Sequence, residues 1–335
     1  MKKWYESDNK TPVVSTRIRL ARNLNMIPFS TRISDDMRAE TNDKIVAAIM
    51  SGPEALTGTL KCIDMDDISQ TEALSMVERH MISPEFAQKR KNRKLVFSED
   101  ESVSIMLGEE DHIRIQVLKG DMQLNEAYDI ADKIDTVLSE QLDIAFDKDL
   151  GYITECPTNL GTGLRASVML HLPLLEALGE IPQLADSVSK IGLTIRGIYG
   201  ESSGVKAAMY QLSNQVTLGI PEQSAIDNLK SITMQIIDRE EQVRKQVDPI
   251  KLEDTIYRAY GILKNARLLS SEEMMENVSS LLLGVRSKVI NLGNDCQPLK
   301  LMIETQPAMM MLEENENDAE KRDIKRAQIF RNALE

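Results

Sequence analysis

Hydrophobic and polar residues alternate with a period of two along several short stretches in the first two thirds of the chain. In TPVVSTRIRL (11–20) the apolar side of this alternation faces one way, while Ser15, Arg17 and Arg19 face the other. Five later stretches are also predicted as strands: KLVFS (94–98), ESVSIML (101–107), HIRIQVL (112–118), RASVMLHL (165–172) and GLTIRGIYG (192–200). The pattern predicts a mainly antiparallel sheet, in which AMYQLSN (208–214) pairs beside the last of these strands.

Helical patterns lie between and after these strands. ISDDMRAETNDKIVAAIM (33–50) begins with Ser34 as a helix N-cap and has acidic residues in its first turn, and ISQTEALSMVERHM (68–81) is a second predicted helix. Pro173 is expected to start a further helix, because its fixed φ suits a first turn. After Pro221 apolar residues recur at helical spacing, at Ile226, Leu229, Ile232 and Ile236.

These patterns predict an α+β fold, with a mainly antiparallel sheet flanked by helices and an all-α region after it. We expect two domains, covering residues 1–244 and 245–335, with four or five helices in the second. The second domain is rich in methionine, which is typical of adaptable helix packing and is also compatible with a dimer interface.

Composition narrows the class of protein. A net charge of −13 argues against direct nucleic-acid binding, which needs a basic surface. The three cysteines are far apart, as are the three histidines, so neither a disulfide framework nor a structural metal site is indicated. No apolar run is long enough to cross a membrane and the N-terminus has no signal-peptide pattern, so we expect a cytoplasmic protein.

Five arginines stand on the polar side of predicted strands or at a strand end. They are Arg17, Arg19, Arg114, Arg165 and Arg196. Taken singly, each is well explained as a solvated arginine on a sheet. Taken together, they suit a polyphosphate, since guanidinium groups are permanently charged and bind phosphate in a bidentate manner. The segment CPTNLGTGLRASV (156–168) lacks the Gly-Lys-Ser/Thr ending of a phosphate-binding P-loop, so the arginines are the stronger candidates.

Four motifs identify a resemblance. STRIRLARN, GEEDHIRIQ, CPTNLGTGLRASV and RGIYGESSG, in this order, resemble the phosphagen kinase family, which includes creatine and arginine kinases, over residues 12–240. The resemblance implies ATP and Mg²⁺ as cofactors, arginines that grip the phosphates, and a histidine that flanks the adenine. The implied nucleotide-binding residues are Ser15, Thr16, Arg17, Ile18, Arg19, His80, Arg114, Arg165, Ala166, Ser167, Val168, Met169, Arg196, Gly197, Ile198, Tyr199 and Gly200.

The same resemblance implies the residues around the acceptor. Glu110 and Glu201 are the carboxylates that would bracket an acceptor guanidinium, and Cys156 lies where the family places a reactive cysteine. Cys156 is equally well explained as a small residue that closes a turn. Glu109 and Asp111 are expected to be turn charges or water-mediated metal contacts.

Departures from the family pattern point to one branch of it. Members that act on small molecules carry a helical domain before the STRIR motif, which begins here at Ser15, and an arginine where this chain has Tyr199. The chain therefore resembles the bacterial branch that phosphorylates arginine side chains in proteins. RDIKRA (322–327) resembles a motif by which that branch binds phosphoarginine at an allosteric pocket, implying Arg322, Asp323, Arg326 and Ala327. The alternative is a solvated helix in which Asp323 pairs with Arg326.

The partners implied by this resemblance are a second copy of the chain in a homodimer, arginine-bearing protein substrates with a heat-shock repressor among them, a Clp-type unfoldase and protease in a stress response, and a zinc-binding activator protein. Two other functions stay open at this point. One is a kinase of a free guanidino metabolite, and the other is a weakly active adaptor that binds phosphoarginine.

Overall fold

The computed structural model of the chain describes residues 3–7, 10–54, 58–198, 207–293, 296–313 and 316–335. The backbone forms two compact units, each assembled from several segments. The first unit contains residues 1–4, 16–167 and 213–230, and the second contains residues 5–15, 168–212 and 231–335. This division by contacts differs from the predicted domains at 1–244 and 245–335, which stay a prediction.

The strands follow the predicted pattern closely. They are β1 (Val13–Arg22), β2 (Leu60–Asp64), β3 (Lys94–Ser98), β4 (Val103–Leu107), β5 (Ile113–Gly120), β6 (Phe146–Asp147), β7 (Gly151–Tyr152), β8 (Leu164–His171), β9 (Leu193–Gly197) and β10 (Met209–Asn214). Eight of them form one sheet in the order β2-β3-β4-β5-β1-β8-β10-β9, and β6 pairs with β7. The mainly antiparallel sheet is confirmed, as is the pairing of β10 beside β9.

The helices confirm the predicted starts. They are α1 (Asp35–Met50), α3 (Gln70–Glu78), α4 (Pro84–Gln88), α5 (Leu124–Gln141), α6 (Pro173–Ala177), α7 (Ile181–Ser189), α8 (Glu222–Gln246), α9 (Pro249–Asn265), α10 (Ser271–Arg286), α11 (Pro298–Glu304), α12 (Pro307–Glu313) and α13 (Ala319–Ala333). The Ser34 side chain caps α1 by accepting a hydrogen bond from the Met37 amide at 3.3 Å. Pro173 is the first residue of α6.

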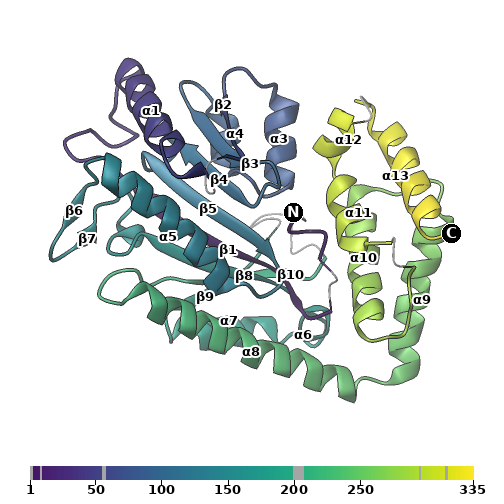
Figure 1. Cartoon of the computed structure of the whole chain (residues 1–335). Coiled ribbons are helices and arrows are strands. Elements are labelled where there is room, and N and C mark those ends of the chain that lie inside the picture. The colour runs from purple at the N-terminus through teal and green to yellow at the C-terminus, as the bar shows by residue number, and fades with distance from the viewer. Residues whose placement is uncertain (1–2, 8–9, 55–57, 199–206, 294–295, 314–315) are drawn as a thin grey trace. The chain divides into compact units, whose positions relative to one another are not determined.

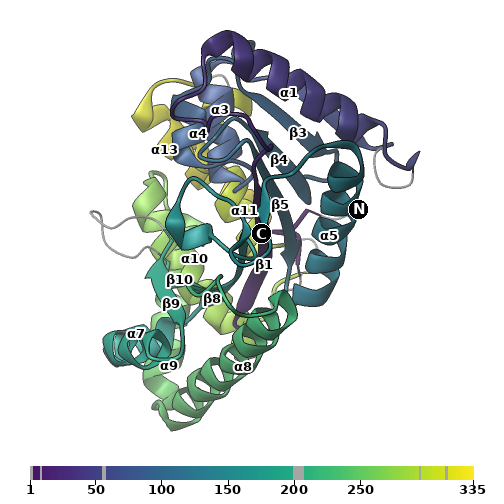
Figure 2. The same ribbon diagram turned by 90° about the vertical axis from the view of Figure 1, so that its left-hand side faces the viewer.

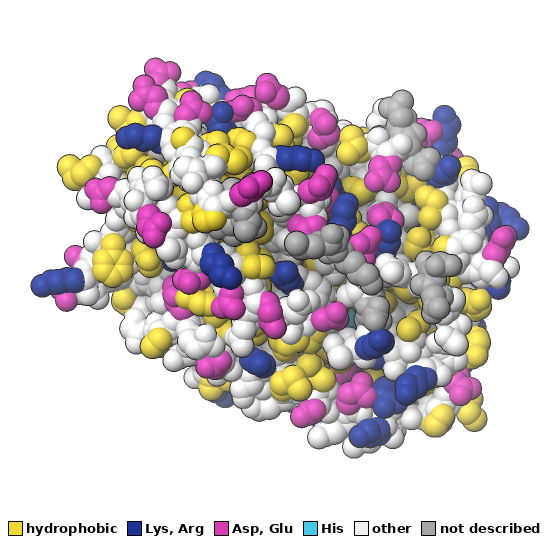
Figure 3. All heavy atoms as spheres, in the orientation of Figure 1, with side chains coloured by type: hydrophobic (Ala, Val, Ile, Leu, Met, Phe, Trp, Pro, Cys, Tyr) yellow, Lys and Arg dark blue, Asp and Glu magenta, His cyan; other side chains and the backbone are white. Residues whose placement is uncertain are grey.

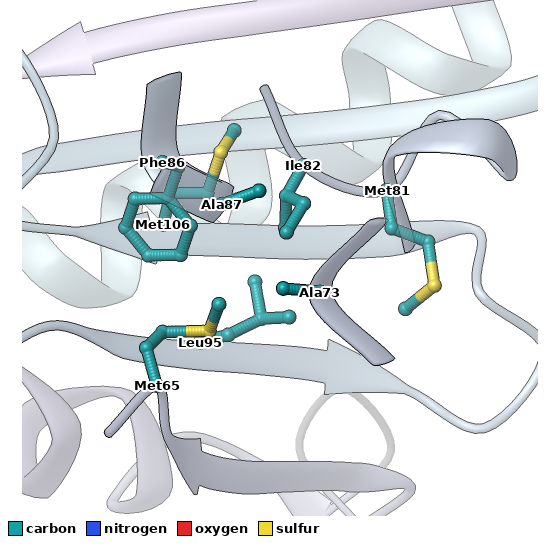
Figure 4. Close-up of a cluster of buried hydrophobic side chains, with 8 residues drawn as sticks. All are labelled: Met65, Ala73, Met81, Ile82, Phe86, Ala87, Leu95 and Met106. Carbon is teal, nitrogen blue, oxygen red and sulfur yellow. The ribbon is translucent and has the colours of Figure 1, made fainter. Parts of the chain in front are cut away.

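Helices cover both faces of the sheet within the first unit. Helices α1 and α5 lie over one face of β3, β4 and β5, and α3 and α4 lie over the other (Figures 1 and 2). The second face carries a buried apolar cluster that joins α3 and α4 to β3 and β4 (Figure 4). Its members are Met65, Ala73, Met81, Ile82, Phe86, Ala87, Leu95 and Met106.

Strand β2 and helices α4 and α5 of the first unit were not predicted, nor was the two-residue strand β6. Strand β2 reads LKCID, and its side chains are half-buried or exposed at the sheet edge, so the sequence carries a weak alternation. Helix α5 buries Ala127, Ala131, Ile134 and Leu138 on one side, but small alanines and charged neighbours dilute the apolar signal.

A buried polar network ties three helices of the second unit together. The Glu240 carboxylate in α8 accepts hydrogen bonds from the Leu174 and Leu175 amides of α6, both at 3.0 Å. His171 contacts Ser279 Oγ through Nε2 at 2.8 Å and Arg286 Nη1 through Nδ1 at 3.1 Å. Because an arginine can only donate, the ring proton of His171 lies on Nε2 and is donated to Ser279. Burial lowers the pKa of His171 well below its ordinary value, which keeps the ring neutral.

The all-α region after residue 245 is confirmed. Helices α9 to α13 pack against one another within the second unit (Figure 1), which agrees with the predicted four or five helices. Within the described ranges no helix is long and apolar enough to span a membrane. Acidic and basic side chains are interspersed on the face of the molecule in Figure 3.

A buried ion pair at the end of β1 joins four segments of the first unit. Arg22 is 1% exposed and donates from Nε and Nη2 to the Asp135 carboxylate in α5, with Nη2 to Oδ2 at 2.7 Å. Its Nη1 donates to the carbonyls of Ala21 and Thr162, and its guanidinium lies 3.4 Å from the centre of the Tyr152 ring. Removing one partner of such a pair leaves a buried charge uncompensated.

Asp135→Ala is therefore expected to destabilise the protein by about 3 to 5 kcal/mol, because Arg22 stays buried without its carboxylate. Urea unfolding followed by circular dichroism measures this change. The matched control is Asp254→Ala, which removes the partner of Arg258 in an exposed pair on α9 and is expected to leave the midpoint unchanged. Equal effects of the two substitutions would contradict the role given to Arg22.

Candidate active site

Four of the five predicted phosphate-binding arginines lie together on one face of the sheet. Arg17 and Arg19 come from β1, Arg114 from the neighbouring β5, and Arg165 from β8 on the other side of β1. All four side chains are half-buried, whereas the residues around them in these strands are mostly buried. Because side chains two residues apart in a strand share a face, Arg17 and Arg19 project side by side. Three adjacent strands thus present four cations to one region.

The pKa values of the central two arginines report this proximity. The pKa of Arg17 falls to about 10, through burial and then through the positive charges of Arg165 and Arg114. Burial and the neighbouring Arg17, Arg114 and Arg165 lower the pKa of Arg19 well below its ordinary value. Among the residues that the structure describes, the buried Nε of Arg19 has no hydrogen-bond partner. A cluster of this kind stores repulsion that an anion would relieve.

Arg114 is held in place by the buried carboxylate of Glu109. Its Nη1 donates to Glu109 Oε1 at 2.7 Å, and the same Glu109 oxygen accepts a hydrogen bond from Ser83 Oγ at 2.6 Å. Glu109 is 6% exposed. Glu109 lies in the turn between β4 and β5, as expected of a turn charge, and its burial beside a cation makes it an anchor for Arg114.

Asp111, on the other side of Glu110, is anchored as well. It is fully buried, and its Oδ1 accepts hydrogen bonds from Asn23 Nδ2 at 2.7 Å and from the Glu155 amide at 2.8 Å. It is therefore a buried charge of the same turn. With both neighbours buried, Glu110 is the half-exposed carboxylate of the turn, with 40% of its side chain accessible.

Glu110 lies in the turn before β5 and not on the strand itself, since β5 begins at Ile113. It still meets Arg114, whose Nη2 lies 3.3 Å from Glu110 Oε2. Burial raises the pKa of Glu110 above its ordinary value, while Arg114 opposes the rise. A carboxylate with a raised pKa accepts a proton more readily, which suits a general base.

The segment that contains Cys156 lies beside this turn. Asn159 Nδ2 is 3.5 Å from Glu110 Oε2, and Asn23 donates both to Asp111 and to the Ile153 carbonyl at 3.0 Å. The half-buried Cys156 Sγ is 3.0 Å from Thr158 Oγ1. Glu110 and the CPTN segment are therefore brought together, as a site that contains both would require.

The two glycines of GTGLR adopt a backbone conformation and a close packing that other residues disfavour. Gly161 has φ +110°, and a Cβ there would lie 2.3 Å from the Thr217 carbonyl oxygen. Gly163 has φ +63°, and its Cβ would lie 2.6 Å from the Ala21 carbonyl oxygen. Only glycine tolerates both the left-handed backbone and such close approach. These glycines let the chain enter β8 in the register that carries Arg165.

His80 lies next to the arginine cluster. It has φ +62° and stacks on the ring of Trp4, with 5.1 Å between ring centroids. Burial, and then the charge of Arg17, lowers the pKa of His80 to about 3, so the ring is neutral at physiological pH. A neutral aromatic ring beside bound phosphates is compatible with the expected contact to adenine.

The other predicted nucleotide residues play different parts. Strand neighbours of the arginines are buried and hold the strands in the sheet; they are Ser15, Thr16, Ile18, Ala166, Ser167, Val168 and Met169. Thr16 Oγ1 donates to the Asp121 carbonyl at 2.7 Å. Arg196 and Gly197 end β9 in the second unit, where Arg196 is exposed, and the Ile198 amide donates to the Met209 carbonyl. Tyr199, Gly200 and Glu201 lie outside the described residues.

The RDIKRA segment lies on α13 in the second unit. Arg326 is 1% exposed and donates to the Thr305 and Leu269 carbonyls at 2.9 and 2.8 Å and to Asp323 Oδ1 at 2.5 Å. Arg322 is half-buried and donates to the carbonyls of Glu316 and Asn317, and Ala327 is fully buried. Arg326 anchors the helix in this conformation, and a phosphoarginine pocket at these residues stays a prediction.

Solved structures with a similar fold support the architecture. The duplicated taurocyamine kinase from Schistosoma mansoni is 23% identical, with a TM-score of 0.62 over 79% of this chain and 38% of that chain. A lombricine kinase is 21% identical, with a TM-score of 0.60 over 74% of this chain and 71% of that chain. Likeness at this level of identity shows the fold.

Family models and relatives of similar sequence identify the family as well as the fold. The model of the ATP:guanido phosphotransferase C-terminal catalytic domain matches residues 40–243, and that of the protein-arginine kinase McsB C-terminal domain matches residues 249–335. A protein-arginine kinase of Halothermothrix orenii is 41% identical over 96% of this chain and 93% of that protein. One of Clostridium acetobutylicum is 40% identical over the whole of both chains. The chain therefore belongs to the protein-arginine kinases of the ATP:guanido phosphotransferase family, the phosphagen kinases.

Proposed function

We propose that this protein-arginine kinase binds the phosphates of MgATP on the four clustered arginines and transfers the γ-phosphoryl group to an arginine side chain presented at Glu110. The observation that carries the proposal is the convergence of Arg17, Arg19, Arg114 and Arg165 beside one half-exposed carboxylate. Phosphoryl transfer needs mainly positioning and neutralisation of charge, and this arrangement offers both.

The proposed binding site for the phosphoryl donor, MgATP, consists mainly of positively charged side chains. A triphosphate would replace the repulsion among the four guanidinium groups with bidentate, charge-assisted hydrogen bonds. Among the described residues no three His, Cys, Asp or Glu side chains gather into a metal site. This fits Mg²⁺, which commonly binds through substrate phosphates and water, and which would add further neutralisation of the transferring group.

The acceptor side must overcome the basicity of arginine. A guanidinium stays protonated far above neutral pH, so deprotonating it at neutral pH costs about 8 kcal/mol. A positioned general base supplies a factor of about 10² to 10⁴ in rate, or roughly 3 to 5 kcal/mol. Glu110 would orient the acceptor by hydrogen bonds and accept its proton as the N–P bond forms. In-line placement and the arginine cluster supply the remainder.

Arg114 couples the two sides. It contacts Glu109 at 2.7 Å and Glu110 at the longer distance of 3.3 Å. A triphosphate that engages Arg114 would weaken the longer contact first, which frees Glu110 for the acceptor guanidinium. Donor binding would thereby prepare the base. Glu201 is the proposed second carboxylate and Cys156 a proposed contact of the acceptor, both by family resemblance.

The wider role follows from the same resemblance. We propose that phosphoarginine marks proteins, a heat-shock repressor among them, for a Clp-type unfoldase and protease in a stress response. We also propose a homodimer, a zinc-binding activator protein and regulation at Arg322 and Arg326. The motifs and the match to the McsB C-terminal domain support this part of the proposal.

Glu110→Gln is expected to lower turnover by about 10² to 10⁴, because the amide cannot accept the acceptor proton. Acid-labile phosphate on an unfolded arginine-rich protein measures turnover, with free arginine as a second acceptor that tests for a metabolite kinase. ATP affinity is expected to stay within about twofold, and fluorescence of Trp4, the single tryptophan, reports it from beside His80. The control is Glu99→Gln at an exposed carboxylate. Undiminished turnover in Glu110→Gln would remove the role of Glu110.

Arg19→Gln is expected to weaken ATP binding by about tenfold or more without lowering stability, since it deletes a charged phosphate contact and also relieves repulsion. Arg22→Gln, three residues along the same strand, is the matched control. It is expected to lose stability, because Asp135 then lies buried without its cation. Titration with ATP and urea unfolding separate the two effects. Full ATP affinity in Arg19→Gln would contradict the phosphate site.

The pH profile should show the raised pKa of Glu110. The base works when deprotonated, so kcat/KM is expected to fall as the pH drops through this pKa, at a higher pH than the ordinary glutamate value of about 4.3. Circular dichroism at each pH separates this loss from acid unfolding. An acid limb at or below the ordinary value would count against Glu110 as the base.

A further inference from the structure

The lining of a basic pocket in the first unit includes none of the four clustered arginines. Its volume is about 480 Å³, and its lining combines five cationic side chains with two carboxylates and an amide. The lining residues are Asp35, Arg38, Asp66, Gln88, Lys89, Arg90, Lys91 and Arg93. Most come from the run QKRKNR between α4 and β3, which the site described above does not use.

Arg93 distinguishes this pocket from an ordinary basic loop. It is 8% exposed, and among the described residues its guanidinium has neither a hydrogen bond nor an ion pair, with Nη1 fully shielded. It rests 5.6 Å from the centre of the Phe86 ring, a member of the buried cluster in Figure 4. The two more deeply buried arginines, Arg22 and Arg326, are each satisfied by a carboxylate and two carbonyls. The carboxylates of Glu109 and Glu85 act on Arg93 through their charge alone, so the guanidinium keeps a hydrogen-bond donor that a bound anion or solvent would satisfy.

Hydrogen bonds hold the loop around Arg93 in a defined conformation. The Arg93 amide donates to the Arg90 carbonyl at 3.1 Å, and Asn92 takes φ +52° while its amide donates to Asp66 Oδ2 at 2.8 Å. Both carboxylates of the pocket are thereby occupied, because Asp35 Oδ2 pairs with Lys91 Nζ at 2.6 Å. Both acids thus contact the loop itself, and Arg93 lines the cavity without a carboxylate hydrogen-bonded to it.

The neighbouring cations are partly engaged in the same way. Arg38 donates to the carbonyls of Ser30 and Gly108, at 2.7 and 3.2 Å, and Arg90 donates to the Ile68 carbonyl. Lys89 pairs with Glu85 at 2.9 Å outside the lining. Arg38 and Arg93 are close enough for the charge of Arg38 to lower the pKa of Arg93, after the larger effect of burial. The carboxylates of Glu109 and Glu85 oppose this effect and raise the pKa of Arg93.

We propose that this pocket, centred on Arg93, binds a phosphate dianion at a site separate from the nucleotide arginines. A dianion matches two adjacent guanidinium groups, which grip phosphate oxygens in a bidentate manner. Its source is either inorganic phosphate or a phosphorylated side chain of a protein. The proposal does not depend on phosphoryl transfer, and its test uses no ATP.

The test follows hydrogen–deuterium exchange of residues 88–94 in the full chain during titration with inorganic phosphate, against sodium chloride of equal ionic strength. Phosphate is expected to protect this segment, and Arg93→Gln is expected to weaken the protection by about tenfold or more in concentration. Arg19→Gln, which alters the nucleotide cluster, is expected to keep it. This local readout separates the pocket from any phosphate bound at the nucleotide site.

Two further arms complete the experiment. Lys89→Gln with Lys91→Gln removes exposed lining charges and is expected to weaken protection by a few-fold, so the proposal remains testable if Arg93→Gln unfolds the protein. A phosphoserine peptide is compared with its unphosphorylated counterpart. If only the phosphorylated peptide protects the segment, and does so at a lower concentration than inorganic phosphate, the source is a phosphorylated side chain. If inorganic phosphate protects the segment and neither peptide does, the source is the free ion. Equal protection by chloride, or protection that survives both sets of substitutions, shows an adventitious ion only and overturns the proposal.

Discussion

Repulsion among guanidinium groups on one sheet face is the constraint on which the site depends. The sheet places Arg17, Arg19, Arg114 and Arg165 on three neighbouring strands, and their charges depress the pKa values of the central two. Folding alone gains nothing from such an arrangement. We propose that a bound polyanion would relieve this repulsion, so the cluster would be more stable in the complex than in the free protein.

The three carboxylates beside the cluster differ in burial and in their contacts. Glu109 and Asp111 are buried and committed to Arg114, Ser83 and Asn23, and Glu110 between them stays accessible. The three acidic residues are adjacent in the sequence, yet burial gives them different roles. The same principle separates Arg22, which a carboxylate satisfies, from Arg19 on the opposite side of the same strand, which nothing described here satisfies at Nε.

Much of the fold was predictable because period-two alternation and helix caps are local signals. The strands that carry the arginines and the cap at Ser34 appear where the pattern placed them. Strand β2 was not predicted because an edge strand with exposed side chains need not alternate between polar and apolar residues. The family motifs indicated which arginines share a site. Local periodicity could not do so, because it does not show which distant strands pair.

Other features of the site were beyond a local pattern. The burial of Glu109 was not predictable, because burial of a carboxylate depends on the partner that tertiary structure supplies, here Arg114. Arg22 carried a usable signal that was missed: it lies at an even position of β1, in phase with Ile18 and Leu20 and thus toward the core. Arg93 carried none, since a basic run gives no indication of which member is buried.

A structure of the protein with MgATP or an unreactive analogue tests the central claim most directly, through the distances from the phosphate oxygens to the guanidinium nitrogens of Arg17, Arg19, Arg114 and Arg165. The expected result is hydrogen-bond contact at about 3 Å with all four, and Glu110 beside the γ-phosphoryl group. Phosphates bound elsewhere, with these four side chains turned toward solvent, would contradict it.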